Sequence, residues 1–104
     1  MDTIENNKLI AEFMGLTIIT DGISFFDTNY KVLKKYNSDW NDLMAVVNKI
    51  EQMDKGRFTV AITHSIICIY DNDTDESIEV KQNPLTKIEA VYQAVIKFIN
   101  NKRA

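Results

Sequence analysis

Residues 86–103, TKIEAVYQAVIKFINNKR, decide the expected fold because they form the clearest helical pattern in the chain. Thr86 and Glu89 have the spacing of a capping box, in which each side chain accepts a hydrogen bond from the other residue's backbone N–H. Apolar residues then recur with the 3.6-residue period of a helix that buries one face, namely Ile88, Val91, Tyr92, Val95, Phe98 and Ile99. This segment therefore predicts a long helix packed against a core.

The residues before this helix predict an antiparallel sheet. Phe58, Val60 and Ile62 alternate with small or polar residues, which indicates a strand with one buried face. Residues 63–65 form a turn, and the next five, IICIY at 66–70, are apolar throughout, which is typical of a central strand covered on both faces. After an acidic loop at 71–76, residues 77–81 add a short edge strand.

A second helix is predicted from about residue 38, with Asn37 or Ser38 as its cap and Gly56 as its terminator. Its main apolar stripe comprises Trp40, Leu43, Val47 and Ile50, widened by Met44, Val46 and Met53. Since Trp40 begins that stripe, a core anchor is favoured there over an exposed stacking platform.

The N-terminal third predicts a helix and a hairpin. Residues 3–14 carry apolar side chains at helical spacing, and Gly15 is placed to end the helix. Strands are expected at 16–20 and 23–26, joined by a two-residue turn at Asp21-Gly22. Residues 30–36 fit either a third strand or a short helix. The chain is therefore expected to be α+β, a mainly antiparallel sheet of about four to six strands sandwiched by three helices.

Composition limits the function classes. The chain has 104 residues and a net charge of −3, which fits a single domain over residues 1–104 with one modest core. The mild acidity argues against nucleic-acid binding, and no apolar run is long enough to cross a membrane. One cysteine, Cys68, and an acidic, polar start without the features of a signal peptide suit a reducing compartment such as the cytoplasm.

Residues 36–51, YNSDWNDLMAVVNKIE, resemble the block Y-x-S-W-x-x-L-M-x-V-V-x-K-I-E of small uncharacterised phage and prophage proteins. Residues 10–15, IAEFMG, and 87–92, KIEAVY, resemble the same group, and the three blocks follow in the same order. The chain is also similar to the phage ABA sandwich domain, a resemblance that implies helices on both faces of a sheet. It further implies a phage accessory protein that binds a host protein or sequesters a nucleotide signal of host immunity.

One segment combines positive charge with aromatic rings. Such a set can hold a phosphate or stack a base, which makes this segment the candidate ligand or partner surface. Lysines that discourage edge-to-edge aggregation of an exposed strand would give the same pattern. The candidate residues are Tyr30, Lys31, Lys34, Lys35, Tyr36 and Trp40.

Other chemical motifs are weaker. His64 and Cys68 are single representatives of their types, but on one extended strand they would lie roughly 13 Å apart. Residues 71–76, DNDTDE, begin like a calcium loop, yet Glu76 stands where glycine is needed, so a solvated loop is favoured. No metal site, cofactor site or catalytic motif is predicted.

These observations favour a phage accessory protein that acts by binding, rather than an enzyme. The expected partner is a nucleotide-type small ligand or a host defence protein, with the pocket at the interface of a homo-oligomer. The alternatives are a protein-interaction or structural phage module without a small ligand and, less favoured, a small nucleotide hydrolase.

Overall fold

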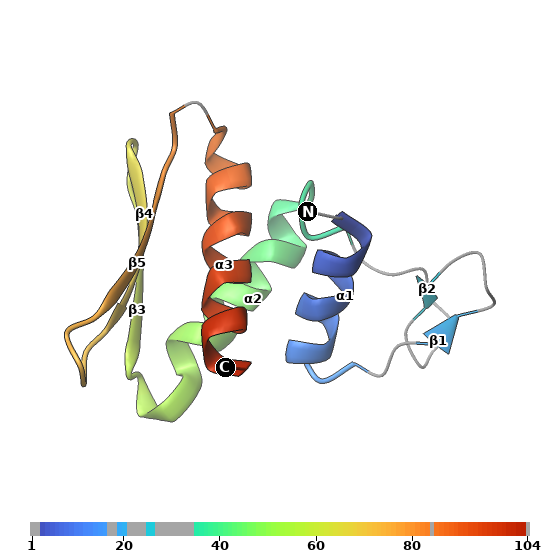
Figure 1. Ribbon diagram of the computed structural model, residues 1–104, viewed down its shortest axis with the longest axis horizontal. Helices are drawn as coiled ribbons and strands as arrows, with labels where there is room; N and C mark the ends of the chain where they lie inside the picture. Colours follow the sequence, from blue (N-terminus) through green and yellow to red (C-terminus); the bar gives the residue numbers. More distant parts are fainter. Residues whose placement is uncertain (1–2, 17–18, 21–24, 27–34, 84, 104) are drawn as a thin grey trace.

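The computed structural model describes residues 3–16, 19–20, 25–26, 35–83 and 85–103 (Figure 1). In this described part of the chain, three α-helices and five strands form an arrangement that matches the expected α+β class. Their bounds in chain order are α1 Thr3–Phe13, β1 Ile19–Thr20, β2 Phe25–Phe26, α2 Trp40–Gln52, the short 3-10 helix η1 Met53–Lys55, β3 Phe58–Ile62, β4 Ile66–Asp71, β5 Ser77–Lys81 and α3 Lys87–Arg103.

The main sheet is antiparallel and has the order β3-β4-β5. The central place of β4, the turn at 63–65 and the edge strand at 77–81 are therefore confirmed. Two cross-strand rows point toward the helices, Val60–Ile69–Ile78 and Ile62–Ile67–Val80. This face of the sheet forms one wall of the core.

All three helices lie on the same side of the sheet (Figure 1). α3 packs on β4 and β5, whereas α2 packs on β3. The expectation of helices on both faces is wrong, because α2 before β3 and α3 after β5 pack on the same face, and the hairpins between the strands contain no helix. The opposite face, here called the outer face, has no covering layer in the described part of the chain.

The N-terminal strands form a separate two-stranded sheet. Ile19 pairs with Phe26 and Thr20 with Phe25, in antiparallel register. The turn predicted at Asp21-Gly22 lies outside the described residues. The expected sheet of four to six strands is not found as one unit among the described residues. The strand or helix expected at 30–36 falls mostly outside them, and 36–38 form a turn.

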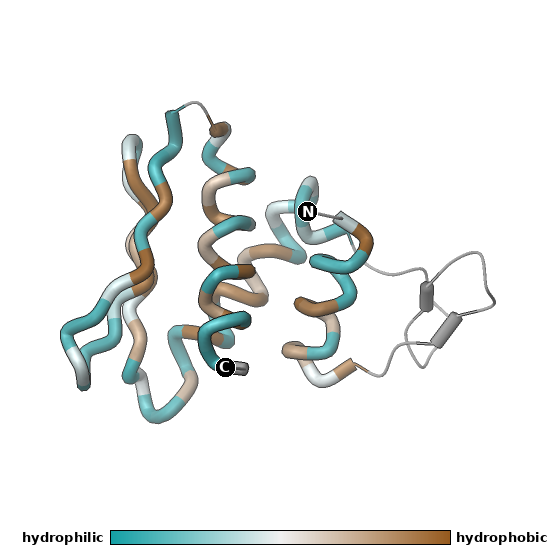
Figure 2. The backbone as a smooth tube through the Cα atoms, viewed as in Figure 1, coloured by the Kyte–Doolittle hydropathy of each residue, from teal (hydrophilic) through white to brown (hydrophobic). Residues whose placement is uncertain are grey.

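α3 is buried on several sides, because it also packs against α1 and α2. Its predicted capping box is confirmed: the Glu89 N–H donates to Thr86 Oγ1 at 3.3 Å, and the Thr86 N–H donates to Glu89 Oε1 at 3.4 Å. Figure 2 shows hydrophobic positions along α2, α3 and the strands that face them. The buried residues of α3 are Ala90, Val91, Tyr92, Ala94, Val95, Ile96, Phe98 and Ile99.

The start of α2 differs from the prediction. Asp39, and neither Asn37 nor Ser38, is the N-cap, since its carboxylate accepts from the Asn41 and Asp42 N–H groups at 2.9 and 3.2 Å. Trp40 is 39% exposed, so it is not the expected core anchor. The first turn of a helix that starts at residue 40 aims this side chain outward, and the buried stripe begins at Leu43.

The helix ends follow the predicted glycines. Gly15 has φ +88°, and the Leu16 N–H closes the end of α1 on the Ala11 carbonyl at 3.0 Å. Lys49 of α2 donates to the Phe13 carbonyl at the same end of α1. Gly56 has φ +83°, but η1 separates it from the end of α2.

Replacing Phe98 with alanine is expected to lower the free energy of unfolding by about 3–5 kcal/mol. Phe98 is 3% exposed, and its ring packs edge-on against Phe58 at a centroid distance of 4.9 Å, so truncation leaves a cavity between α3 and the sheet. Urea unfolding followed by circular dichroism measures the change. Asn100→Ala, at an exposed position of the same helix, is the control and should change it by less than about 1 kcal/mol.

Candidate functional site

Half of the predicted surface segment can be placed. Lys35 is exposed and Trp40 partly exposed, whereas Tyr36 is 2% exposed and belongs to the core. Tyr30, Lys31 and Lys34 lie outside the described residues. The role of this segment in binding stays a prediction. Asn37, which follows Tyr36 in the chain, lines a pocket.

One pocket beside α3 lies where α1, the 36–38 turn and α3 meet. It has a volume of about 540 Å³, and we call it the amide pocket because three side-chain amides line it. That volume falls within the range of roughly 300–1,000 Å³ typical of small-molecule sites. Its lining residues are Thr3, Asn6, Asn37, Glu89, Tyr92, Gln93, Ile96 and Lys97.

A buried hydrogen-bond relay fixes one wall of the amide pocket. The Tyr92 hydroxyl donates to Asn7 Oδ1 at 3.0 Å, and Asn7 Nδ2 donates to Asn37 Oδ1 at 3.0 Å. Asn7 is only 6% exposed, so its amide has little freedom to turn. Since the Asn37 oxygen is already an acceptor, the Asn37 NH₂ group is the part of this amide that remains to donate to a ligand.

The exposed line of α3 supplies the other wall. Glu89, Gln93 and Lys97 are spaced four residues apart, so they follow one another along the same face of the helix. Eight residues of helix place the Cα atoms of Glu89 and Lys97 roughly 12 Å apart along the axis. The pocket therefore offers an acceptor at one end, amides in the middle and a cation at the other end.

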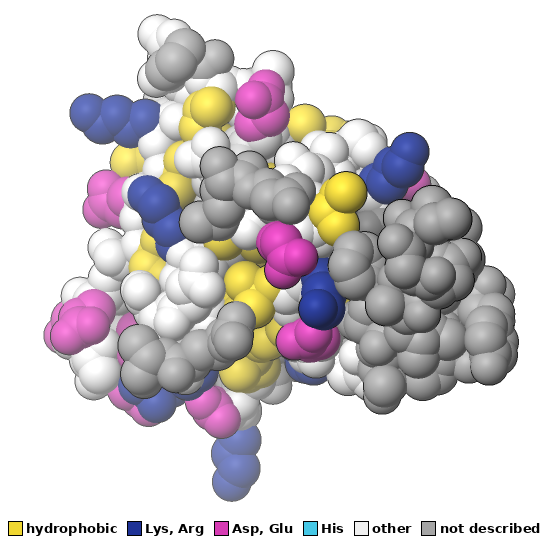
Figure 3. Space-filling model, turned by 45° about the vertical axis from the view of Figure 1, so that its right-hand side comes forward, with side chains coloured by type: hydrophobic (Ala, Val, Ile, Leu, Met, Phe, Trp, Pro, Cys, Tyr) yellow, Lys and Arg dark blue, Asp and Glu magenta, His cyan; other side chains and the backbone are white. Residues whose placement is uncertain are grey.

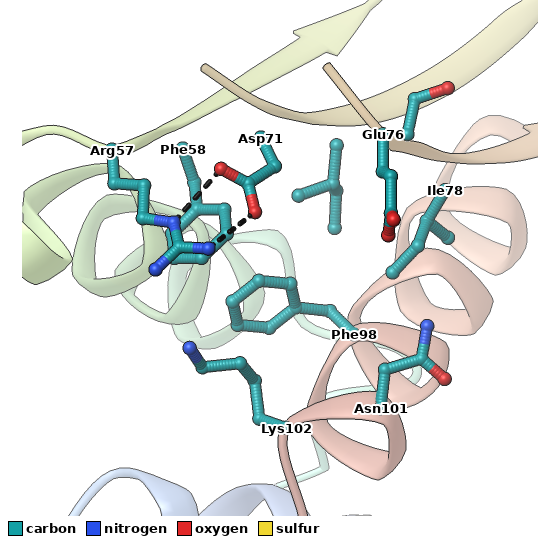
Figure 4. Close-up of a pocket in the computed structure, with 10 residues that line it drawn as sticks. Arg57, Phe58, Asp71, Glu76, Ile78, Phe98, Asn101 and Lys102 are labelled. Atoms are coloured by element: carbon teal, nitrogen blue, oxygen red, sulfur yellow. Dashed lines mark hydrogen bonds and ion pairs between the residues drawn. The ribbon is translucent and has the colours of Figure 1, made fainter. Parts of the chain in front are cut away.

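A second pocket lies between the sheet and the C-terminal end of α3 (Figure 4). It has a volume of about 230 Å³, and we call it the sheet-end pocket. Phe58 and Phe98 form its aromatic floor. Arg57 makes a bidentate ion pair with Asp71, with N–O distances of 2.9 and 2.8 Å. The Lys102 ammonium lies 5.0 Å from the centroid of the Phe58 ring.

The charges around the sheet-end pocket disfavour an anionic ligand. Arg57 is occupied by Asp71 and lies 3.5 Å from an oxygen of Asp73, while Lys102 lies 3.9 Å from Asp54. Carboxylates outnumber cations there, at positions Asp54, Asp71, Asp73 and Glu76. The hydrogen bonds from Arg57 hold the pKa of Asp71 well below its usual range. We therefore assign the Arg57–Asp71 pair a structural role: it closes this end of the sheet by joining the start of β3 to the end of β4.

Surface charge offers no simpler guide to a site. On the face shown in Figure 3, basic and acidic side chains are interspersed among the coloured residues and do not form patches of one sign.

The weaker sequence motifs are also placed. His64 lies exposed in the turn between β3 and β4, and Cys68 lies half-buried on the outer face, in the middle of β4. The described residues contain no group of three or more His, Cys, Asp or Glu side chains that could hold a metal ion. In the acidic loop, Asp71 pairs with Arg57, and Asp75 accepts from the Tyr70 hydroxyl, which is a structural arrangement of the loop carboxylates.

The prediction from sequence missed the amide pocket, although one signal pointed toward it. Asn7 stands three residues before Ile10 and four before Ala11, so it falls on the apolar stripe of α1. A polar residue on a buried stripe needs a partner, since an unpaired buried amide is costly. The identity of that partner depends on tertiary packing, because Tyr92 is 85 positions away.

Comparison with known proteins adds no relatives: no family model, curated protein or solved structure matches the chain. The resemblance to phage proteins thus stays a prediction. Among the described residues, no helix combines the length and the apolar character that crossing a membrane requires.

Replacing Asp71 with asparagine is expected to lower stability at pH 7 and to weaken its dependence on acid. Because the folded-state pKa of Asp71 is lowered, the ionised carboxylate stabilises the fold above about pH 4, and this contribution is lost as the pH falls further. Urea midpoints at pH 7 and pH 3 measure the effect.

Glu76→Gln, the same change of charge at an exposed position beside the same pocket, is the control. If D71N and E76Q lose the same stability at pH 7 and respond to acid alike, the Arg57–Asp71 pair is not what closes the sheet end.

Proposed function

We propose that the protein acts by binding a nucleotide-type ligand in the amide pocket. The observation that carries this proposal is the relay from Tyr92 through Asn7 to Asn37, which orients a donor at the pocket wall before any ligand arrives. An oriented donor lowers the entropy cost of recognition, which is the usual benefit of a preorganised site.

The chemistry along α3 supports this ligand class. The Lys97 ammonium suits a phosphate, which it binds as a compact point charge. Amide side chains can bond both the donors and the acceptors of a base edge or sugar, and Gln93 stands in the middle of the line. The Glu89 carboxylate has a second oxygen beyond the one in the capping box, and it suits the amino group of a base. The spacing of roughly 12 Å between Glu89 and Lys97 suits a single nucleotide unit.

The resemblance to phage accessory proteins supports a setting for this binding. In that setting the protein sequesters a nucleotide signal of host immunity in the bacterial cytoplasm and so acts as a counter-defence factor. The neighbouring genes test the setting independently of the ligand, because a cluster of known defence antagonists would support it.

Isothermal titration calorimetry against nucleoside monophosphates, cyclic dinucleotides and ADP-ribose tests the proposal. At least one of them should bind, and Asn37→Asp should weaken its binding by about tenfold or more. Aspartate keeps the oxygen that accepts from Asn7, so the relay is retained, but the donor to the ligand is lost.

Asn100→Asp is the matched control, because it makes the same change at an exposed position of α3 outside the lining of the pocket. It should leave the affinity within about twofold. Absence of binding at millimolar ligand would exclude the proposed function. If the protein turns over a nucleotide and a chelator abolishes this turnover, the proposed function changes from binding to hydrolysis.

A further inference from the structure

The central strand carries a sequence pattern that its monomeric surroundings do not explain. Ile67 and Ile69 are buried against the helices, as one apolar face requires. The alternate residues Ile66, Cys68 and Tyr70 are also apolar or aromatic, yet they lie on the outer face, where no described layer covers them. A strand apolar on both faces is typical of a sheet buried on both faces.

The cross-strand register gives the layout of the outer face. Ala61, Cys68 and Glu79 form one row, and Ile66 and Lys81 belong to the next row. On the outer face, the apolar side chains thus run along β4, and the small side chain of Ala61 flanks them on β3. On β5, the opposite charges of Glu79 and Lys81 stand two residues apart. Glu79 and Lys81 are both exposed.

This layout is complementary to itself. The row between the two just named is Ile62–Ile67–Val80, which faces the core. Consider a two-fold axis that lies between two facing sheets, perpendicular to their strands and directly over that row. Rotation about this axis lays β5 of one copy over β5 of the other. The same rotation sets Glu79 of each copy opposite Lys81 of the other, and Cys68 opposite Ile66. Such mutual contacts are the mark of an isologous interface.

We propose that the outer face is the interface of a homodimer, in which two sheets pack face to face and one helical layer lies outside each. The partner is a second copy of this chain, because rotation pairs opposite charges and places apolar residues of β4 on each other. The packed sheets form the aligned type of sandwich, with the sheets roughly 10 Å apart. The three-stranded face is small for a protein interface, so the dimer forms reversibly with concentration.

Sedimentation velocity from about 10 μM to about 1 mM protein measures this equilibrium. The wild type should shift from monomer to dimer over that range. Glu79→Lys or Lys81→Glu alone should each raise the dissociation constant by about tenfold, because symmetry brings every reversal into two contacts. The double variant E79K/K81E exchanges the charges and should restore dimerisation to within about threefold of wild type.

Glu51→Lys provides the matched control, since Glu51 is an exposed glutamate on α2, away from the outer face. It changes the net charge as much as E79K does and should leave the dimer intact. A second readout is the rate at which a maleimide labels Cys68, which should fall as the dimer forms. A wild-type chain that remains monomeric at 1 mM, or a double variant no better than the single ones, would overturn the proposal. None of these residues lines the amide pocket, so failure of the dimer and failure of nucleotide binding are distinguishable.

Discussion

Simultaneous burial of α3 against the sheet and against α1 is the constraint on which the rest of the structure depends. A helix that packs on two layers needs apolar residues over most of its circumference, and α3 has them, with Ala90 and Ala94 among its fully buried positions. Only a narrow line of this helix is left for polar residues. Glu89, Gln93 and Lys97 occupy that line, so the amide pocket lies where the packing of α3 leaves room for it.

The amide pocket and the sheet-end pocket contain similar numbers of polar groups but differ in how those groups are used. In the sheet-end pocket, the Arg57 guanidinium donates two hydrogen bonds to the Asp71 carboxylate, and its charge is balanced by that carboxylate. In the amide pocket, the hydrogen bonds run from the buried Tyr92 hydroxyl through Asn7 to Asn37, which is part of the pocket lining. A satisfied pair stabilises a fold, whereas a chain of bonds that ends at a cavity wall can also serve recognition.

Local patterns predicted local structure well. The capping box at Thr86 and Glu89, the alternation in 58–62 and the glycine at position 15 depend on interactions a few residues apart, and the structure has each of them. The layering was not predictable in this way, because an apolar β4 predicts coverage of both faces without saying whether helices of the same chain provide it. Trp40 illustrates a second limit, since moving the cap of α2 by one or two residues turned a predicted core side chain toward solvent. For the candidate site, only the neighbourhood of Asn37 was within reach of sequence reasoning, because the relay joins residues far apart in the chain.

The bond between Asn7 and Tyr92 also has a consequence for the order in which the protein assembles. Residues 58–103 contain the sheet and α3, and most of their contacts join neighbouring segments, so this part can form rapidly once it exists. α1 precedes α3 in the chain, yet α3 provides its packing surface. During synthesis the N-terminal helix must therefore wait with its apolar face unprotected until the final turns of α3 leave the ribosome. For that interval α1 is exposed to chaperones and to aggregation, and the core is completed only when α3 packs against it.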